Sequence, residues 1–227
     1  MKSVIVKSLG FAPETITVMK PSALLFSLLL PGALACVSAV AAEPSPSSKA
    51  DLAKGESIST NVCVSCHSND GSRGSPANPI IQGQHPEYLV KQLTEFKGGL
   101  RNNPIMRGIA STLSPEDMKN VAAFYSTKQP KPGFAKNKDS VKLGEQIYRG
   151  GIADRNIPAC AGCHSPGGGG IPAQYPRLAG QHADYAEAQL VAFRAAARNN
   201  SATMVGIAAK MNDREIKAVA DYIAGLR

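Results

Sequence analysis

The sequence of 227 residues contains no tryptophan, and aromatic residues make up only 5% of it. It has no run of alternating or β-branched residues that would predict a strand. Five cysteines are present, but Cys36 falls in a predicted export signal and the other four belong to two short motifs. None therefore remains for a disulfide. These absences exclude a disulfide framework, disfavour a β-rich fold and leave few large side chains for a core.

The two cysteine motifs share the pattern C-x-x-C-H. They occupy residues 63–67 (CVSCH) and 160–164 (CAGCH), ninety-seven residues apart. This pattern is the attachment signal of c-type haem, in which two thiols bond to the vinyl groups of one porphyrin and the histidine ligates the iron. The sequence therefore predicts two covalently bound haem c groups. The predicted attachment residues are Cys63, Cys66, Cys160 and Cys163, and the predicted proximal ligands are His67 and His164.

A pair of cysteines with this spacing also occurs in structural zinc sites and in redox dithiols. A structural zinc site usually has its second cysteine pair within about twenty residues, whereas the second pair here comes far later and both pairs are followed by histidine. A thioredoxin-like dithiol needs a βαβ context, which neither motif has. Haem attachment explains both motifs better than either alternative.

The first forty-two residues have the features of a secretory signal peptide. Basic residues precede an uncharged apolar stretch that starts at Ala23, and the small residues 40–42 fit a cleavage site. We therefore expect residues 1–42 to be removed and the mature protein to lie in the periplasm. The alternative is an uncleaved membrane anchor, because residues 22–42 carry no charge and are nearly long enough to span a bilayer. That alternative would give membrane association.

Basic residues exceed acidic ones, and the excess lies in the second half of the chain. Residues 43–130 hold nine basic and eight acidic side chains, whereas residues 131–227 hold thirteen and eight. The haem propionates would offset part of this charge. A moderate, uneven charge indicates a docking face for an acidic protein partner rather than nucleic-acid binding. Ordinary solvated surface is the alternative.

The sequence repeats itself around the two motifs. GQHPEYLVKQLTEF at residues 83–96 matches GQHADYAEAQLVAF at residues 180–193, again at an offset of ninety-seven. This duplication predicts two tandem domains. Each half is small enough for a side-chain core to be marginal, and a buried porphyrin would supply apolar volume. We predict a flexible leader at 43–49, a first domain at 50–127, a linker at 128–139 and a second domain at 140–227.

Each unit is predicted to contain three helices and no strand, so the expected fold is all-α. Gly55 and Gly144, in the opening helices, would allow the closing helices to cross closely. Acidic residues follow the capping residue of each closing helix, where they favour the positive end of the helix dipole. The opening helices are expected at about residues 49–62 and 140–149, the middle helices from Pro86 and Ala183, and the closing helices after Ser114 and Asn212.

The sixth coordination position of each iron needs a ligand from elsewhere in the chain. We favour Met106 and Met204, which fall at matched places in Gly-, Asn- and Pro-containing segments that we expect to be loops. His85 and His182 are the alternative, but both follow Gly-Gln at the start of a helix and are more consistent with polar contacts there. Two further methionines align with apolar residues of the other unit and are expected to pack in the core: Met118 and Met211.

Taken together, the motifs resemble the di-haem cytochrome c4 family over residues 50–227. The resemblance is carried by two tandem units with C-x-x-C-H, the segment G-Q-x-x-x-Y-x-x-x-Q-L-x-x-F and a methionine before the closing helix. It implies two tandem class I cytochrome c domains, each with about three helices around a covalent haem. It also implies an exported electron carrier whose partners are redox proteins, such as a quinol-oxidising complex, a terminal oxidase or a dehydrogenase.

The resemblance to class I cytochromes c also implies contacts around the haem. The carbonyl groups of Pro79 and Pro176, each twelve residues after a motif histidine, are expected to accept a hydrogen bond from that histidine. Four further side chains are candidates for the haem propionates, with packing of the tyrosines and solvent exposure of the arginines as the alternative. They are Tyr88, Tyr185, Arg101 and Arg198.

Two other functions remain open. The chain would also suit the cytochrome subunit of a periplasmic dehydrogenase, for example a flavin-containing sulfide dehydrogenase. A di-haem peroxidase is the third possibility, but it needs one iron that can lose its sixth ligand, and His-Met ligation closes the iron against substrate. We therefore expect an electron-transfer protein and not an enzyme.

Overall fold

The computed structural model describes residues 49–227, which lie within one compact unit. Every regular element within these residues is a helix, apart from two isolated β-bridges. The prediction of an all-α fold is confirmed. In the same part of the chain no helix is both long and apolar enough to cross a membrane. The predicted signal peptide at 1–42, and all but the last residue of the predicted leader, lie outside the described residues.

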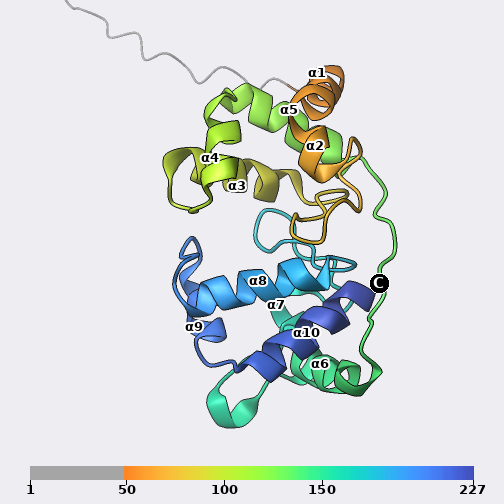
Figure 1. Cartoon of the computed structure of the whole chain (residues 1–227), viewed down its shortest axis with the longest axis vertical. Coiled ribbons are helices and arrows are strands. Elements are labelled where there is room, and N and C mark those ends of the chain that lie inside the picture. The colour runs from red at the N-terminus through yellow and green to blue at the C-terminus, as the bar shows by residue number, and fades with distance from the viewer. Residues whose placement is uncertain (1–48) are drawn as a thin grey trace, which may run out of the picture. The chain divides into compact units, whose positions relative to one another are not determined.

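The helices of the first half surround the first cysteine motif (Figure 1). They are α1 (Leu52–Ile58), a π-helical turn (Ser59–Cys63), α2 (Val64–His67), α3 (Pro86–Gly98), α4 (Pro104–Ser111) and α5 (Pro115–Ser126). The closing helix α5 packs on both α1 and α3, and α3 also packs on α4. The motif histidine is the last residue of α2, so the chain leaves the helix directly after it.

The second half repeats this packing. Its elements are α6 (Lys138–Gly150), a 3₁₀ turn (Ala153–Arg155), α7 (Ala161–His164), α8 (Ala183–Arg194), α9 (Ala202–Ala208) and α10 (Asp213–Gly225). Helix α10 packs on α6 and α8, α8 packs on α9, and α6 contacts the motif helix α7. The internal repeat of the sequence therefore corresponds to a repeat of the helix arrangement.

Both closing helices begin with a capping box, as their sequences indicate. The Ser114 side chain accepts from the Asp117 backbone N–H, and the Asp117 carboxylate accepts from the Ser114 N–H. Asn212 and Glu215 make the same reciprocal pair at the start of α10. Each pair satisfies two backbone donors that a helix start leaves without partners, so these boundaries are fixed locally. The predicted starts of the closing helices are confirmed.

The two opening helices meet the closing helices at glycines, as predicted. A Cβ atom at Gly55 would lie 2.3 Å from the carbonyl oxygen of Asn120, and one at Gly144 would lie 2.1 Å from that of Ala218. Both distances are far below van der Waals contact, and the atoms concerned are backbone. The helices of each half can therefore approach this closely only where the opening helix carries no side chain.

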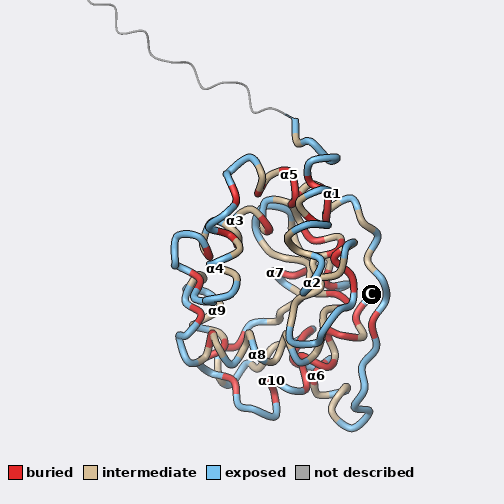
Figure 2. Tube along the Cα trace, turned by 45° about the horizontal axis from the view of Figure 1, so that its top comes forward, coloured by how far each residue is buried: buried red, intermediate tan, exposed pale blue. Residues whose placement is uncertain are grey.

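Each half has its own hydrophobic core, to which its closing helix contributes. Figure 2 marks the buried residues along the chain in red. Met118 is 2% exposed and Met211 is 4% exposed, which confirms that both pack in the core. The buried apolar residues of α5 and α10 are separated by three or four positions, as one face of a helix requires. They include Met118, Val121 and Tyr125 in α5, and Ile216, Val219 and Ile223 in α10.

The prediction of one helix over residues 49–62 is wrong in detail. Helix α1 ends at Ile58 and a π-helical turn follows, which is a common feature close to functional sites. Ser59, the first residue of that turn, is fully buried; its hydroxyl donates to the carbonyl of Asn69 at 2.6 Å and lies 2.8 Å from the hydroxyl of Tyr125. These contacts hold the turn against the core just before the cysteine motif.

The opening helix of the second half begins at Lys138 and not at residue 140. The side chain of Asn137 accepts from the backbone N–H groups of Asp139 and Ser140, at 3.0 and 3.3 Å, and so starts the helix earlier. The backbone N–H groups of Lys136 and Asn137 in turn donate to the carboxylate of Asp221 in α10. The end of the connecting segment is thus attached to the closing helix.

The close approach at Gly144 gives a testable difference within one helix. The substitution Gly144→Ala should destabilise the protein by about 1–3 kcal/mol, because its Cβ collides with backbone of α10. The matched control is Gly150→Ala in the same helix, where a Cβ meets no atom within 4 Å. It should stabilise by about 0.5–1 kcal/mol, because alanine restricts the unfolded chain. Chemical denaturation followed by circular dichroism measures both; equal effects would contradict the packing described.

Candidate functional site

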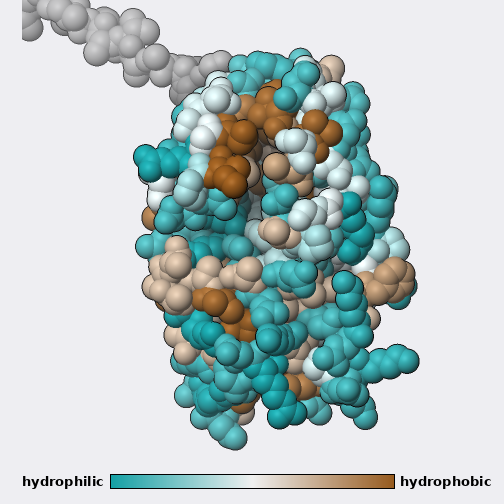
Figure 3. Space-filling model, viewed as in Figure 1, coloured by the Kyte–Doolittle hydropathy of each residue, from teal (hydrophilic) through white to brown (hydrophobic). Residues whose placement is uncertain are grey.

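A cavity of about 660 Å³ holds both cysteine motifs. Its walls include residues of α2 to α5 and of α7 to α10, and most of the side chains that form them are apolar. Figure 3 shows hydrophobic side chains bordering a hollow in the part of the surface that the first half forms. The cysteines and histidines of both motifs line the cavity: Cys63, Cys66 and His67, with Cys160, Cys163 and His164.

The apolar wall has equivalent members in the two halves. In the first half it is formed by α3, α4 and α5, and in the second by α8, α9 and α10. Such a wall suits a flat apolar ligand, because each side chain that covers the ligand is itself removed from water. The wall includes Leu93, Phe96 and Ile109 in the first half, and Leu190, Phe193 and Ile207 in the second.

The ring of each motif histidine is held by a proline carbonyl. His67 Nδ1 lies 3.0 Å from the carbonyl oxygen of Pro79, and His164 Nδ1 lies 3.0 Å from that of Pro176. A carbonyl oxygen can only accept, so Nδ1 must carry the proton in both rings. The Nε2 atoms then keep their lone pairs, and neither makes a hydrogen bond among residues 49–227. The expected proline contacts are confirmed, and each ring presents a nitrogen that can bind a metal.

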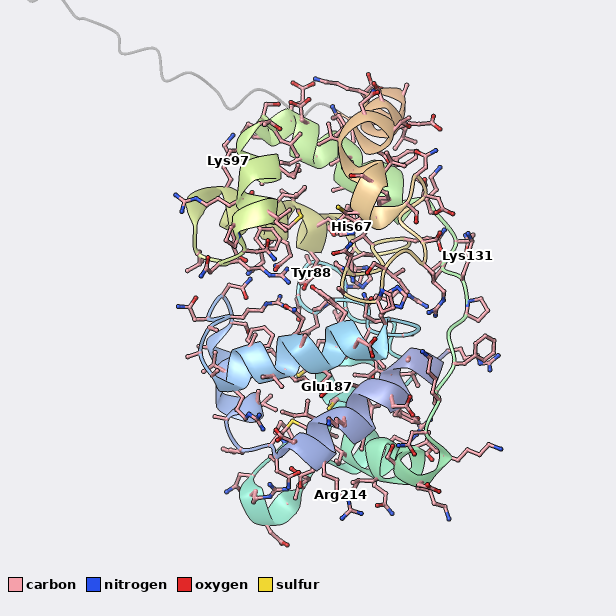
Figure 4. The ribbon with its side chains drawn as sticks, viewed as in Figure 1. His67, Tyr88, Lys97, Lys131, Glu187 and Arg214 are labelled. Atoms are coloured by element: carbon pink, nitrogen blue, oxygen red, sulfur yellow. The ribbon has the colours of Figure 1, made fainter. Side chains whose placement is uncertain are left out.

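Burial keeps both rings neutral. Removal from water lowers the pKa of His67 and of His164, and the proline carbonyl opposes this shift only in part because it favours the protonated ring. The neutral imidazole is the form that ligates a metal ion. His67 lies at the end of α2, with its label next to that helix in Figure 4.

None of the four motif cysteines forms a disulfide. Burial raises the pKa of Cys63, and it raises that of Cys160 to about 11, so both are neutral at pH 7. Within the described residues no group of three or more His, Cys, Asp or Glu side chains could hold a metal ion. Neither motif therefore has the four donor side chains that a structural zinc site usually needs.

Met106 and Met204 both line the cavity, but not from loops as predicted. Each lies in the first turn of a short helix, α4 or α9. The loop prediction is wrong because polar residues cap these turns: Asn103 accepts from the Met106 N–H at 3.0 Å, and Ser201 accepts from the Met204 N–H at 3.4 Å. The structure thus brings the motif histidine and the predicted methionine of each half to the same cavity, which Met211 of the second core also lines.

The alternative ligands His85 and His182 do not line the cavity. Both stand at the residue before a helix, α3 or α8, as their sequence positions indicate. His85 Nε2 donates to the carbonyl of Gly169 in the other half at 2.9 Å. His182 Nε2 is buried and has no hydrogen-bond partner among the described residues. The geometry therefore favours the methionines over the histidines.

Arg101 and Arg198 are buried, at 7% and 9% exposure, so the alternative of solvent exposure is wrong. Both line the cavity, and neither forms an ion pair with a carboxylate among residues 49–227. Their guanidinium groups donate to neutral oxygens of both halves. The acceptors are the side chains of Gln92, Gln189 and Tyr185 for Arg101, and of Gln92, Gln189, Tyr88 and Asn200 for Arg198.

These features fit a covalent haem in each half. The thiols are free to bond, each histidine keeps one nitrogen without a partner, and the cavity is apolar. Two buried cations without a carboxylate partner suit the carboxylates of a porphyrin, because an unpaired buried charge is costly. No zinc-like or dithiol-like arrangement explains the same set of residues.

The comparisons with known proteins agree with this geometry. The family described as cytochrome c matches residues 141–227, and the family described as cytochrome c oxidase, cbb3-type, subunit III matches residues 50–124. Cytochrome c4 of Thiocapsa roseopersicina is 42% identical, covering 78% of this chain and 93% of its own length. The thiosulfate dehydrogenase electron acceptor of Stutzerimonas stutzeri strain A1501 is 37% identical, covering 87% and 94%.

A solved structure shows the same fold. The crystal structure of reduced recombinant cytochrome c4 from Pseudomonas stutzeri has a TM-score of 0.74 and 38% identity, and the match covers 79% of this chain and all of the other. The chain belongs to the cytochrome c4 family. It contains two tandem class I cytochrome c domains, and its cofactors are two covalently bound haem c groups. It is an electron-transfer protein and not an enzyme.

The cytochrome c4 resemblance did not reveal the hydrogen bonds between the two halves. Gln92 and Gln189 accept from both arginines, and Gln84 and Gln181 each bind backbone of the other half. The only sequence feature that could have indicated a role for these glutamines is that each recurs at the same position of both repeats. A glutamine repeated at one position of both units gives no hint of its partner in the other half, because that partner lies 93 or 101 residues away for Gln84 and Gln181.

The arginine network predicts a large effect at one glutamine. Gln92→Leu removes an oxygen that accepts from Arg101, Arg198 and Asn200, so it should destabilise the holoprotein by about 2 kcal/mol. The control is Gln146→Leu, an exposed position of α6, which should change stability by less than about 0.5 kcal/mol. Guanidinium denaturation of both variants tests this; a similar midpoint for the two would contradict the network.

Proposed function

We propose that the protein is an exported electron carrier of the periplasm, made from a first haem domain at residues 50–127, a linker at 128–139 and a second domain at 140–227. The basic residues, apolar stretch and small residues of 1–42 support a signal peptide that is removed on export. Independent packing of the helices on each side of the linker supports two domains.

In each domain the haem is attached through its two motif cysteines and ligated by the motif histidine and one methionine. The observation that carries this assignment is the shared cavity: in each half it contains a histidine with Nε2 free and a methionine thioether. When bound, the haem supplies an iron that gains and loses a single electron. The proposed thioether attachments are Cys63, Cys66, Cys160 and Cys163, and the proposed axial pairs are His67 with Met106 and His164 with Met204.

The chain's own side chains then have separable roles. The histidine and methionine of each half would hold the iron between them and leave no position for a substrate, which favours electron transfer. The apolar walls exclude water from the site, and Arg101 and Arg198 neutralise propionate charge. Tyr88 and Tyr185, whose hydroxyls already accept from these arginines, help to orient them.

The proposed partners are a quinol-oxidising complex as donor and a terminal oxidase as acceptor. Surface charge supports docking to acidic proteins, because five basic side chains on α6 and α10 are exposed, Arg214 among them in Figure 4. Such charges speed the encounter of two proteins and make its rate depend on salt. The five are Lys138, Lys142, Arg149, Arg214 and Lys217.

A second candidate function is electron acceptance from a periplasmic dehydrogenase. It is favoured by the likeness to a protein named thiosulfate dehydrogenase electron acceptor, which extends over 87% of this chain. The haem sites would be the same in both functions. Only the protein that delivers the electrons would differ.

Substitution of the cavity methionines tests the axial assignment. In oxidised protein, Met106→Leu should remove about half of the sulfur-to-iron charge-transfer band, because one of two haems loses its thioether. It should also let added imidazole bind that haem. Met118→Leu is the matched control: this methionine is packed in the core, so its replacement should leave the band intact. A full band in the Met106→Leu protein would contradict the assignment.

Donor competition distinguishes the two candidate functions. If the protein serves respiration, membranes supplied with quinol should reduce it, and the rate should fall several-fold as salt rises from low to physiological concentration. Under the second function, thiosulfate with a purified thiosulfate dehydrogenase should reduce it much faster than quinol with membranes. Stopped-flow absorbance of the haem measures both rates. Reduction by neither donor would contradict both candidates.

A further inference from the structure

The peptide groups after Pro79 and Pro176 are hydrogen-bonded on both sides. The carbonyl of the Pro79–Ile80 peptide accepts from His67 Nδ1–H at 3.0 Å. The N–H of the same peptide, which belongs to Ile80, donates to the side-chain oxygen of Gln181 at 2.8 Å. Gln181 lies just before α8 in the second half, so a chain of two hydrogen bonds through one peptide joins a histidine of one half to a glutamine of the other.

The reciprocal chain has the same geometry. His164 Nδ1–H donates to the carbonyl of Pro176 at 3.0 Å, and the N–H of the same peptide, from Arg177, donates to the side-chain oxygen of Gln84 at 2.8 Å. Each glutamine also donates its amide N–H to a carbonyl at the same place: Gln84 to Arg177 and Gln181 to Ile80, both at 2.9 Å. The two side chains therefore bind backbone of the opposite half at two points each.

A second contact orients each glutamine. The oxygen of Gln84 also accepts from the backbone N–H of His85, and that of Gln181 from the N–H of His182, both at 3.0 Å. Gln84 is 7% exposed. A buried amide with both its oxygen and its nitrogen engaged has little freedom to rotate, so the peptide that it binds is held in one position. This accounts for the Gly-Gln pair that the sequence repeats before each middle helix.

Donation from a peptide N–H strengthens its carbonyl as an acceptor, because hydrogen bonds in a chain polarise one another. A stronger acceptor on Nδ1–H makes the ring a more electron-donating ligand, which favours the oxidised metal. We propose that Gln84 and Gln181 are positioning residues that act across the two halves, each polarising the carbonyl that holds the other half's motif histidine and so lowering the reduction potential of the other half's haem.

This inference rests on the proposed ligation of the irons by His67 and His164, and it has a sharp signature. Gln181→Met keeps the side-chain length but removes the oxygen that Ile80 N–H needs. It should raise the midpoint potential of the first-half haem and leave that of the second-half haem unchanged. Gln84→Met should raise the midpoint potential of the second-half haem and leave that of the first-half haem unchanged. A merely structural effect would loosen the contact between the halves. It would then change the midpoint potentials of both haems, or that of the haem in the half that carries the substitution.

Nuclear magnetic resonance of the reduced, isotope-labelled holoprotein supplies a readout that does not depend on potentials. In the unsubstituted protein, a coupling across the hydrogen bond should connect the Ile80 amide nitrogen with the Gln181 side-chain carbonyl carbon. In the Gln181→Met protein the ring N–H proton of His67 should move to lower frequency, because its hydrogen bond weakens, while that of His164 stays in place. The control is Asn200→Ala, which removes hydrogen bonds to Gln92 and Glu95 across the same interface but touches neither peptide. It should shift neither ring proton.

The outcomes separate this inference from the proposed function. Crossed shifts in both the ring protons and the potentials support it. A shift in the substituted half, equal shifts in both halves, or no shift would overturn it while leaving the ligation intact. Absence of the resonances of an iron-bound histidine ring would instead overturn the ligation itself. If a glutamine variant fails to assemble, absence of the hydrogen-bond coupling in the unsubstituted protein overturns the inference directly.

Discussion

The site depends on the hydrogen bond from the ring Nδ1 of each motif histidine to a proline carbonyl twelve residues further on. It fixes the tautomer of the ring, so that Nε2 keeps its lone pair for a metal. It also requires the chain to leave the motif helix at once and return beneath it. The residues directly after the two histidines, Ser68 and Ser165, accordingly have positive φ values, which non-glycine residues rarely adopt. The position of the loop and the end of the motif helix are thus both set by the hydrogen bond that orients the histidine.

Duplication of this arrangement creates an interface that neither half has alone. Gln84 and Gln181 exchange backbone contacts across it, and the buried arginines donate to glutamines and tyrosines of both halves. The glutamine–backbone and arginine–tyrosine contacts each occur twice with the halves exchanged, because equivalent residues of the repeat meet there. A carrier built in this way connects its two sites through polar groups that hydrogen-bond to one another, which keeps the halves in a defined relation around a mostly apolar cavity.

Sequence patterns that act within a few residues allowed the main helices to be predicted. The features that the sequence did not reveal depend on contacts between distant parts of the chain. The capping boxes of α5 and α10 and the glycines of α1 and α6 could be predicted because each acts within a few residues or at one close crossing. The short helices α4 and α9 were predicted as loops, since asparagine, proline and glycine suit loops and caps alike. The burial of Arg101 and Arg198 could not be predicted, because it depends on acceptors that the opposite half supplies. The ligand assignments and domain limits remain predictions.

The central claim is that each half supplies one histidine and one methionine to a closed haem site. A spectroscopic redox titration of the purified holoprotein tests it most directly, because the same sample gives the number of haems, their ligands and their potentials. The account predicts two haems per chain, a sulfur-to-iron band from both in the oxidised state, and two one-electron steps with no binding of peroxide. One haem without that band, or one that reacts with peroxide, would contradict it.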